Sequence, residues 1–588
     1  MMITQKKLAA LVALLFSAIT TWAVPVAPWS MPVRQSDGTT LTVRAVGDEW
    51  WHCLLTTDGL VVTHGADGDL YYCMAGMPTA VRAHNPELRE AEECDFILAQ
   101  KQALKLSSMG GDRAVGRRAP RRAGSARVPQ VQPMGRPHVP VIMVQYPDKL
   151  MSSTVADFER HFYVGETSAR QYFADQSNGL FDPQFDLYGI YTLPSPRARY
   201  GTNDSHGNDA GLGTMVMDAI TMSGNTIDWS RYDNDGDGEA DVCIVVYAGV
   251  GEAQATGTVP SSIWPCQWSL SEAQEYGEEG CAPMKKNGVV IDKFAVFNEV
   301  HGWRDLGTEL DGIGTFCHEF SHCLGLPDFY PTVNVPYYGM GSWSLMDEGC
   351  YNDGGHTPVG YSAYEKNYMD WLDYTIARND TQYTLPVLNH GNDMALKVLS
   401  PVHPDEYYIL ENRARQGWDS YIRDEGVLIT HVTYVANRWS KNTVNNGDVQ
   451  LMTIFAADND LSTATEDGDL YGHDNHELTD SSVPAAQLFM EFSGYPSGKA
   501  GMMGKPVTEI YLNNDGSASL WFARGFPAEL VTGDVTGDGR VDVEDVNAVI
   551  NVILGIAASD ELRAASDVTG DGRVDVEDVN AIINVILG

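Results

Sequence analysis

The pattern of apolar and polar positions divides the chain into segments that predict different secondary structure. Near the N-terminus, short alternating runs such as LTVRAV and DLYYCMA lie between Asp-Gly turns and predict strands, and a stretch rich in Glu, Ala, Leu and Gln predicts a helix after them. Further on, VPVIMVQYP and DVCIVVYAG predict buried strands, and QYFADQSNGLF predicts a helix that ends in a turn. From about Thr375 to Ala523, runs such as EYYILENR, EGVLITHVTYV and ASLWFA are spaced by turns without a helical period, which favours a β-sandwich-like unit.

The first 23 residues have the pattern of a secretory signal peptide. Lys6 and Lys7 precede an apolar run that starts at Leu8, and cleavage is expected between Ala23 and Val24. A membrane anchor or a buried helix is the alternative, but the run is shorter than the ~20 residues that a span needs. No later segment is apolar for long enough, so we expect a secreted chain and not an integral membrane protein.

An Arg-rich stretch, GGDRAVGRRAPRRAGSARVPQVQPMGRP, follows the first strands in an otherwise acidic protein. Arginines among Gly, Ala and Pro are not expected to pack, so this segment is predicted to be exposed and open to trypsin-like enzymes. In a secreted chain it indicates a removable propeptide, and a passive interdomain linker is the alternative.

Length and charge narrow the classes of function. With 588 residues the chain is too long for one core, and we expect several structural units. A net charge of -40 argues against nucleic acid or an anionic membrane as a partner. The nine cysteines are too sparse for a disulfide scaffold.

The C-terminus contains an internal repeat: DVTGDGRVDVEDVNAVINVILG recurs as DVTGDGRVDVEDVNAIINVILG. Each copy places oxygen ligands around a tight Gly turn, as a calcium loop requires, and an apolar helical stripe follows. The predicted calcium ligands are Asp534, Thr536, Asp538, Arg540 and Asp545 in the first copy, and Asp567, Thr569, Asp571, Arg573 and Asp578 in the second, with the arginines at the backbone-carbonyl position.

This repeat resembles a type I dockerin, a module that binds a cohesin on a scaffold or cell surface. Threonine stands at 536 and 569, where that family usually has asparagine. The resemblance implies a cohesin-like partner that faces Val543-Glu544 and Val576-Glu577. A calcium-stiffened plug without such a partner is the alternative.

A further acidic loop, DNDGDGEAD, spans residues 233–241. Asp233, Asp235, Asp237 and Asp241 make it a candidate structural calcium site, and a solvated Asp-Gly turn is the alternative. The loop runs into a strand and lacks the position-12 acid of an EF-hand.

The stretch CHEFSHCLGLPDFY carries the strongest chemical signal. On a helix, His318 and His322 project from one face and can hold one zinc ion, with Glu319 beside the open coordination position. Gly325 and a following proline end the helix, and the turn can bring Asp328 back to the metal. Three protein ligands and a bound water are the pattern of catalytic zinc, with Glu319 as the general base for peptide-bond hydrolysis.

The third ligand has two candidates in the sequence. Asp328 is the first, and Glu365 in YSAYEKNYMDWL is a second carboxylate that would define a different class of zinc peptidase. The apolar positions Ile313, Phe316, Phe320 and Leu324 predict a separate stripe that buries the motif helix.

HExxHxxGxxD followed by GSWSLMD resembles the immune inhibitor A family of secreted zinc metallopeptidases, which is related to the metzincins. ARQYFADQSNGLFDPQFDLYG, IDWSRYDNDGDGEADVCIVVYAG and YYILENRARQGWD are similar to that family's landmarks, in the same order. The resemblance implies that His318, His322 and Asp328 bind zinc, that Glu319 is the base, and that Met346 forms the Met-turn below the metal.

Two positions depart from the family pattern. Cys266 stands where a histidine is expected, and Glu348 stands where several metzincins have a tyrosine. The oxyanion-stabilising residue is therefore unassigned, with Tyr351 and His301 as candidates. Three ways of keeping the unprocessed enzyme inactive stay open: a propeptide cysteine that binds the zinc, a propeptide carboxylate that does so, or steric blockage of the site.

Together these features predict a multidomain chain with an α/β zincin (metzincin-like) catalytic domain. The expected units are a signal peptide (1–23), a small α+β propeptide (24–112), an Arg-rich processing linker (113–135), the catalytic domain (136–374), a β-sandwich-like domain (375–525) and a calcium-binding loop-helix dockerin module (530–588). The expected function is a secreted zinc endopeptidase made as a zymogen. The alternative is a non-catalytic, calcium-dependent adhesion or scaffold protein, and Glu319 favours the enzyme because metal binding alone needs no base.

Overall fold

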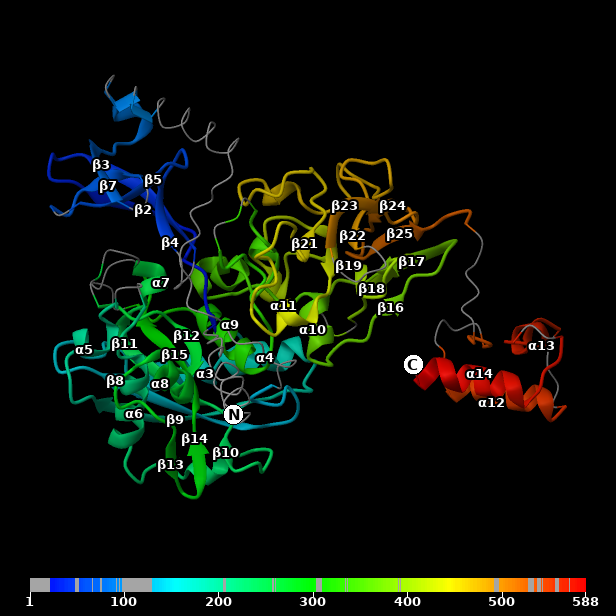
Figure 1. Ribbon diagram of the computed structural model, residues 1–588, viewed down its shortest axis with the longest axis horizontal. Coiled ribbons are helices and arrows are strands. Elements are labelled where there is room, and N and C mark those ends of the chain that lie inside the picture. Colours follow the sequence, from blue (N-terminus) through cyan, green and yellow to red (C-terminus); the bar gives the residue numbers. More distant parts are fainter. Residues whose placement is uncertain are drawn as a thin grey trace, which may run out of the picture.

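The computed structural model shows an N-terminal unit, a central unit, a following unit of sheets and a C-terminal module (Figure 1), and the first three share a buried apolar cluster. It describes residues 22–587 apart from 48–51, 66, 75–76, 91–92, 95, 98–128, 205–207, 256–258, 260, 303–308, 334, 336, 390, 392, 491–495, 527–532, 537–540, 542, 556–559 and 570–571. Most of the predicted signal peptide and most of the Arg-rich segment lie outside the described residues. In the part that is described, no helix is long and apolar enough to cross a membrane.

The N-terminal unit is a six-stranded antiparallel meander in which each strand pairs with the next along the chain. Its strands are β2 (Ser30–Arg34), β3 (Thr40–Gly47), β4 (His52–Thr56), β5 (Val61–His64), β6 (Leu70–Met74) and β7 (Met77–Arg82), followed by a 3-10 turn, η1 (Pro86–Leu88). The strands predicted at LTVRAV and DLYYCMA are confirmed as β3 and β6. Most of the predicted helix lies outside the described residues.

The central unit contains a six-stranded sheet in the order β1-β12-β15-β11-β8-β9. These strands are β1 (Trp22–Ala23), β12 (Cys266–Ser269), β15 (Lys293–Val300), β11 (Cys243–Val250), β8 (His138–Gln145) and β9 (Gln184–Thr192). Strands β15, β11, β8 and β9 are parallel, whereas β12 runs antiparallel to β15 and pairs on its other edge with β1. Both predicted strands are confirmed, and all eight residues of β11 are buried, which explains its continuous apolar run.

Helices and a small sheet surround this central sheet. They are α3 (Val155–Phe162), α4 (Ala169–Gln176), α5 (Ala198–Gly201), α6 (Leu212–Met222), α7 (Glu252–Ala255), α8 (Leu270–Tyr276), α9 (Ile313–Cys323) and α10 (Ala363–Tyr368), with η2 (Trp229–Tyr232), η3 (Gly341–Trp343), η4 (Glu348–Gly355) and the strands β10 (Glu239–Ala240), β13 (Met284–Lys286) and β14 (Val289–Ile291). The helix predicted at QYFADQSNGLF is α4, and its N-cap is the Ser168 hydroxyl.

Helix α9, which carries the HExxH motif, is buried along its whole length. The sequence predicted one apolar stripe, but all eleven residues are buried because neighbours cover every side. Phe320 packs on Phe173 and Phe185 at centroid distances of 5.2 and 5.4 Å. On another side of the helix, a Cβ at Gly314 would lie 1.8 Å from the Cys350 carbonyl oxygen, so only glycine lets η4 approach this closely.

The segment before the central unit is packed over its last residues. Residues 113–135 were predicted to be an exposed linker, but Val131 is buried, and the Gln130 and Val131 amides donate to the Cys323 carbonyl at the end of α9. The Trp371 indole also donates to the Pro133 carbonyl at 2.7 Å. Val131 and Gln130 therefore pack against the end of the motif helix, whereas Gln132, Met134 and Gly135 in the same segment are exposed.

The next unit is built from antiparallel and mixed sheets. The first sheet contains β16 (Thr375–Ile376), β18 (Leu396–Leu399), β19 (Glu406–Arg413), β20 (Gly426–Thr433) and β21 (Met452–Ile454). The second contains β17 (Thr381–Leu385), β25 (Ala518–Phe522) and β24 (Val507–Leu512), and the third contains β22 (Gln487–Met490) and β23 (Pro496–Met502). Three short helical elements lie between strands: α11 (Ala436–Trp439), η5 (Gly417–Asp419) and η6 (Glu466–Gly468). The predicted strands are confirmed as β19, β20 and β25. Leu410 and Ile429 of the first sheet share an apolar cluster with Leu520 and Phe522 of the second.

The C-terminal module contains α12 (Val543–Ile553), α13 (Asp560–Ser566) and α14 (Val576–Leu587). The predicted helices are confirmed as α12 and α14, which lie side by side in Figure 1, and Val549 and Ile582 are buried in one small core. Helix α13 was not predicted. Val543 and Val576 are 65% and 63% exposed, so the apolar ends expected to face a partner are accessible.

A buried ionic network joins the central unit to the sheet that follows it. The Arg413 guanidinium donates to Glu411 at 2.9 Å, to Asp419 at 2.6 Å and to the Gly360 carbonyl at 3.1 Å. Glu411 also accepts from the Ala363 amide at the start of α10, at 2.7 Å. The network therefore ties β19 to the segment that leads into α10.

Arg413→Leu is expected to lower the free energy of unfolding by about 3–5 kcal/mol, because Glu411 and Asp419 would stay buried without their cation. Urea denaturation followed by tryptophan fluorescence measures the change. Arg415→Leu is the control, because Arg415 is exposed and its loss should cost less than ~1 kcal/mol. Equal losses of unfolding free energy in the two variants would show that the network does not stabilise the contact between the two units.

Candidate active site

Four of the predicted zinc-site residues lie together at the end of α9. Ligand atoms of His318, Glu319 and His322 all lie within 4.8 Å of one another. The carboxylate Oδ1 of Asp328 lies 3.1 Å from His318 Nε2 and 3.2 Å from His322 Nε2. The predicted turn is also confirmed, because Gly325 has φ of 106°, in the left-handed region.

Backbone carbonyls fix the orientation of both imidazoles. His318 Nδ1 lies 2.8 Å from the Leu345 carbonyl oxygen, and His322 Nδ1 lies 2.8 Å from the Leu326 carbonyl oxygen. A carbonyl can only accept, so each Nδ1 carries the proton and each Nε2 presents its lone pair toward Asp328. This is the outer-shell arrangement that metal-binding histidines show.

The charges of the group suit a divalent cation. Burial lowers the pKa of His322 to about 4, so its imidazole is neutral. Burial acts to raise the pKa of Asp328, but the neighbouring His322 and His318 lower it below its ordinary value, so the carboxylate is ionised. The two imidazoles and the Asp328 carboxylate converge in a buried place, and this set of ligands fits a zinc ion with one open position.

Asp328 is held by a residue that the sequence did not suggest. Its backbone amide donates to Asn442 Oδ1 at 2.7 Å, and the Asn442 amide group donates back to its Oδ2. Asn442 comes from the following unit, 114 residues away. It has φ of 50°, a conformation that asparagine tolerates better than most residues. Only the fold could reveal this contact, because no short motif surrounds Asn442.

Glu365, the other candidate for the third ligand, makes different contacts. It accepts hydrogen bonds from Ser362 as part of a capping box, from Ser344 Oγ at 2.7 Å and from the Met346 amide at 3.2 Å. Met346 is buried, and its carbonyl accepts from the Phe329 amide at 2.9 Å. Glu365 therefore supports the loop of Met346, and Asp328 is the carboxylate beside the imidazoles.

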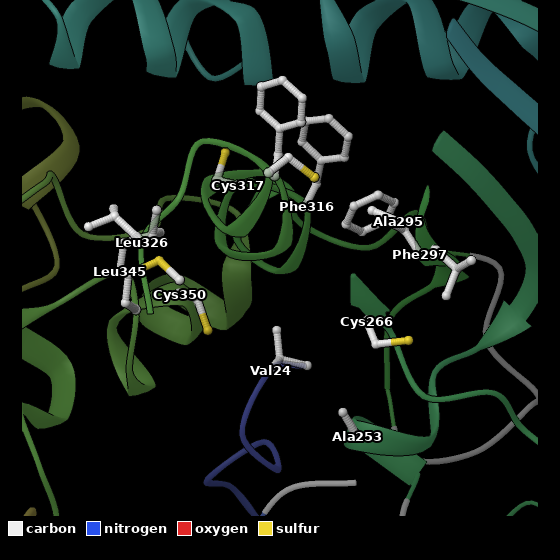
Figure 2. Packing of buried hydrophobic residues seen from close by; sticks show 14 of the residues in the cluster. Val24, Ala253, Cys266, Ala295, Phe297, Phe316, Cys317, Leu326, Leu345 and Cys350 are labelled. Atoms are coloured by element: carbon white, nitrogen blue, oxygen red, sulfur yellow. The ribbon is translucent and has the colours of Figure 1, made fainter. Parts of the chain in front are cut away.

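The chain that follows the predicted signal peptide crosses the site. The Val24 amide donates to Glu319 Oε1 at 2.6 Å, and β1 just before it pairs with β12 at the register Ala23↔Cys266. Val24 is fully buried, and Figure 2 shows its side chain between Cys350 and Cys266. The sequence left three routes to latency open, and the structure places a backbone amide, not a cysteine thiol, at Glu319. The nine cysteines, all of them among the described residues, form no disulfide bond.

The two candidates for oxyanion stabilisation lie in different surroundings. The Tyr351 hydroxyl donates to the Pro25 carbonyl at 2.7 Å, so it contacts the peptide that crosses the site. His301 lies 3.1 Å from Asp311 and packs against the Trp29 ring at 5.3 Å.

The acidic loop at 233–241 brings three of its four predicted ligands together. Carboxylate oxygens of Asp233, Asp235 and Asp237 lie within 4.8 Å of one another. Asp241 instead accepts from the backbone and side-chain amides of Asn234, each at 3.0 Å, and burial raises its pKa to about 6. The structure groups the first three carboxylates, and Asp241 stabilises the loop.

In the C-terminal module, the last acid of each loop holds the same partners in both copies. Asp545 Oδ1 accepts from the Thr536 amide and hydroxyl at 2.9 and 3.0 Å, and Asp578 Oδ1 accepts from those of Thr569 at 3.0 and 2.9 Å. The Gly572 amide donates to Asp567 at 2.8 Å. Of the other predicted ligands, Asp534 and Arg573 are described, whereas Asp538, Arg540 and Asp571 lie outside the described residues.

Comparison with known proteins finds two domain models that match parts of the chain. Residues 146–379 match the catalytic domain model of immune inhibitor A peptidase M6, and residues 532–587 match the dockerin type I domain. The chain contains a peptidase M6 domain and a dockerin type I domain. The first is a metallopeptidase domain whose family implies zinc, and the second implies calcium.

Two curated relatives align with the central part of the chain. Immune inhibitor A of Bacillus thuringiensis subsp. alesti is 27% identical over 225 residues, which cover 34% of this chain and 31% of that protein. Pre-pro-metalloprotease PrtV of Vibrio cholerae serotype O1 is 28% identical over 226 residues, which cover 34% of this chain and 23% of that protein. The matched region thus spans less than a third of each relative's length.

Asn442→Gly is expected to weaken zinc binding about 10–100-fold, because Asp328 loses both of its contacts to the amide while glycine keeps the left-handed backbone. Competition with a chromophoric chelator measures the affinity.

Asn446→Gly is the matched control for this measurement. Asn446 lies in the same loop and bonds Thr332 at 2.8 Å, away from the candidate ligands. An unchanged zinc affinity for Asn442→Gly would remove Asn442 from the metal centre.

Proposed function

We propose that the protein is a secreted zinc-dependent endopeptidase that is made as a zymogen and carries a calcium-folded attachment module. The observation that carries this proposal is the convergence of His318, His322 and Asp328 beside the carboxylate of Glu319, inside a peptidase M6 domain. The names of the relatives, an immune inhibitor and a metalloprotease, support the same class of function.

Each residue of the site has a role in peptide hydrolysis. His318 Nε2, His322 Nε2 and Asp328 would hold the metal, and a zinc ion there supplies Lewis acidity and lowers the pKa of a bound water toward ~7. Glu319 accepts a proton from the attacking water and returns it to the leaving amine. The carbonyls of Leu345 and Leu326 keep the imidazoles in place.

The N-terminal segment supports the zymogen. With Val24 at Glu319 and residues 24–27 bonded to the walls of the site, a substrate cannot reach the carboxylate. Cleavage after Ala23 would convert the Val24 amide into an α-ammonium group that faces Glu319, which strengthens the contact by charge. Cleavage within the Arg-rich segment then frees the N-terminal unit to leave.

The architecture supports the finer assignments in this proposal. We assign the central unit to a metzincin-like fold because an antiparallel strand, β12, runs beside the motif helix α9. The shared apolar cluster of the following sheets supports a β-sandwich-like domain, and the meander that bears the blocking segment supports a propeptide. Asp233, Asp235 and Asp237 would bind calcium, and the dockerin module implies a cohesin-like partner outside the cell.

Glu319→Ala is expected to reduce cleavage of an unstructured protein at least ~100-fold, because the general base is lost. The assay uses the full chain after trypsin nicking at the Arg-rich segment and inactivation of the trypsin. o-Phenanthroline should abolish the same activity by removing the metal.

Glu159→Ala serves as the control, because Glu159 is exposed on α3 and should leave the rate unchanged. Undiminished proteolysis by the Glu319→Ala chain would refute the mechanism and favour a non-catalytic binding protein.

Asp578→Ala is expected to lower the calcium affinity of the C-terminal module about tenfold or more, because the loop loses a charged ligand and its bonds to Thr569. Calorimetric titration of the full chain with Ca²⁺ measures it. Glu577→Ala, at an exposed neighbouring position, should leave the affinity nearly unchanged, and equal losses in both variants would contradict the assigned ligand.

A further inference from the structure

The segment around Val24, which crosses the site, runs in the chain direction that a bound peptide product would have. The Val24 nitrogen is 2.6 Å from Glu319 Oε1, and under the proposed function this carboxylate returns a proton to the leaving nitrogen. Val24 N therefore occupies the place of the leaving amine. The residues after it, Pro25 to Ala27, follow the path of the substrate on the C-terminal side of the cleaved bond.

Two side chains of the central unit bind successive carbonyls of this segment. Trp264 Nε1 donates to the Val24 carbonyl at 3.1 Å, and the Tyr351 hydroxyl donates to the Pro25 carbonyl at 2.7 Å. Trp264 precedes β12 and Tyr351 lies in η4, so the two donors stand on different elements around the segment. Every peptide has these two carbonyls, whatever its side chains.

Both donors are buried, and both are able to donate a hydrogen bond to these carbonyls. Trp264 is 3% and Tyr351 is 6% exposed, and the Trp264 backbone amide is anchored to Asp209 at 2.9 Å. Burial raises the pKa of Tyr351 well above its ordinary value, so the hydroxyl stays protonated and can donate. When the N-terminal segment leaves, both donors lose their carbonyl partners, and the carbonyls of a substrate can take their place.

We propose that Trp264 and Tyr351 are substrate-binding residues that hold the first and second carbonyls beyond the cleaved bond. This inference rests on the proposed function. It implies that productive substrates extend at least two residues past the bond and that their main chain, not their side chains, provides this part of the affinity.

Peptide binding to the nicked full chain tests the inference. The first probe is the peptide VPVAPW with a free amino terminus and a fluorophore at its C-terminus, read by anisotropy. The second is valine pyrrolidide, a competitor that keeps the valine carbonyl but lacks the carbonyl of the next residue.

Tyr351→Phe is expected to weaken the hexapeptide about 5–10-fold and to leave valine pyrrolidide unchanged, because only the hexapeptide has the second carbonyl. Trp264→Phe is expected to weaken both probes by a similar factor. With a polypeptide substrate, Tyr351→Phe should raise KM more than it lowers kcat.

Tyr172→Phe is the matched control. The Tyr172 hydroxyl is equally buried and donates to a protein carbonyl, that of Val359, at 2.7 Å, so its loss should change neither probe. A thermal unfolding scan of each variant checks the fold.

The outcomes separate this inference from the proposed function. If Tyr351→Phe weakens both probes equally, or neither, while proteolysis still depends on Glu319, the assignment of the carbonyl sites is overturned. If the selective pattern appears but the chain does not cleave protein, the binding residues stand and the proposed function fails.

Discussion

The burial of α9 on every side is the constraint on which the rest of the structure depends. A helix that carries two imidazoles and one carboxylate in a closed interior, with the Asp328 carboxylate beside it, needs a partner for each polar group. Carbonyls of Leu345 and Leu326 satisfy the Nδ1 atoms, so both Nε2 atoms are left to converge on Asp328. The loops that supply these carbonyls are fixed in turn by Glu365 and by Asn442, which belongs to the next unit.

The same burial supports the proposal that the N-terminal segment keeps the enzyme inactive. The Val24 amide lies against Glu319, and the residues just before it pair with β12 of the central sheet. Because the blocking segment binds through backbone amides and carbonyls, it uses the contacts that any extended peptide would make. Under the proposed function, inhibition and substrate binding are therefore two uses of one set of donors, and release of the N-terminal unit would separate them.

Much of this could be predicted from sequence because the deciding features are local. The spacing of His318, Glu319 and His322 on a helix, the Gly325 turn, the continuous apolar run of β11 and the repeated C-terminal loops each need only a few neighbouring residues. The all-round burial of α9, the packing of Val131, the role of Asn442 and the contact of Val24 with Glu319 are long-range: Val24 and Glu319 are 295 residues apart. No local pattern marks such pairs, since each depends on how the units meet.

The central claim is that two imidazoles and the Asp328 carboxylate hold a zinc ion with one exchangeable position. X-ray absorption spectroscopy at the zinc edge, on the full chain after nicking and release of its N-terminal unit, tests it most directly. The account predicts one zinc per chain with two nitrogen ligands at ~2.0–2.1 Å and oxygen ligands from Asp328 and water. A spectrum without zinc, or with a thiolate sulfur at ~2.3 Å in the first shell, would contradict it.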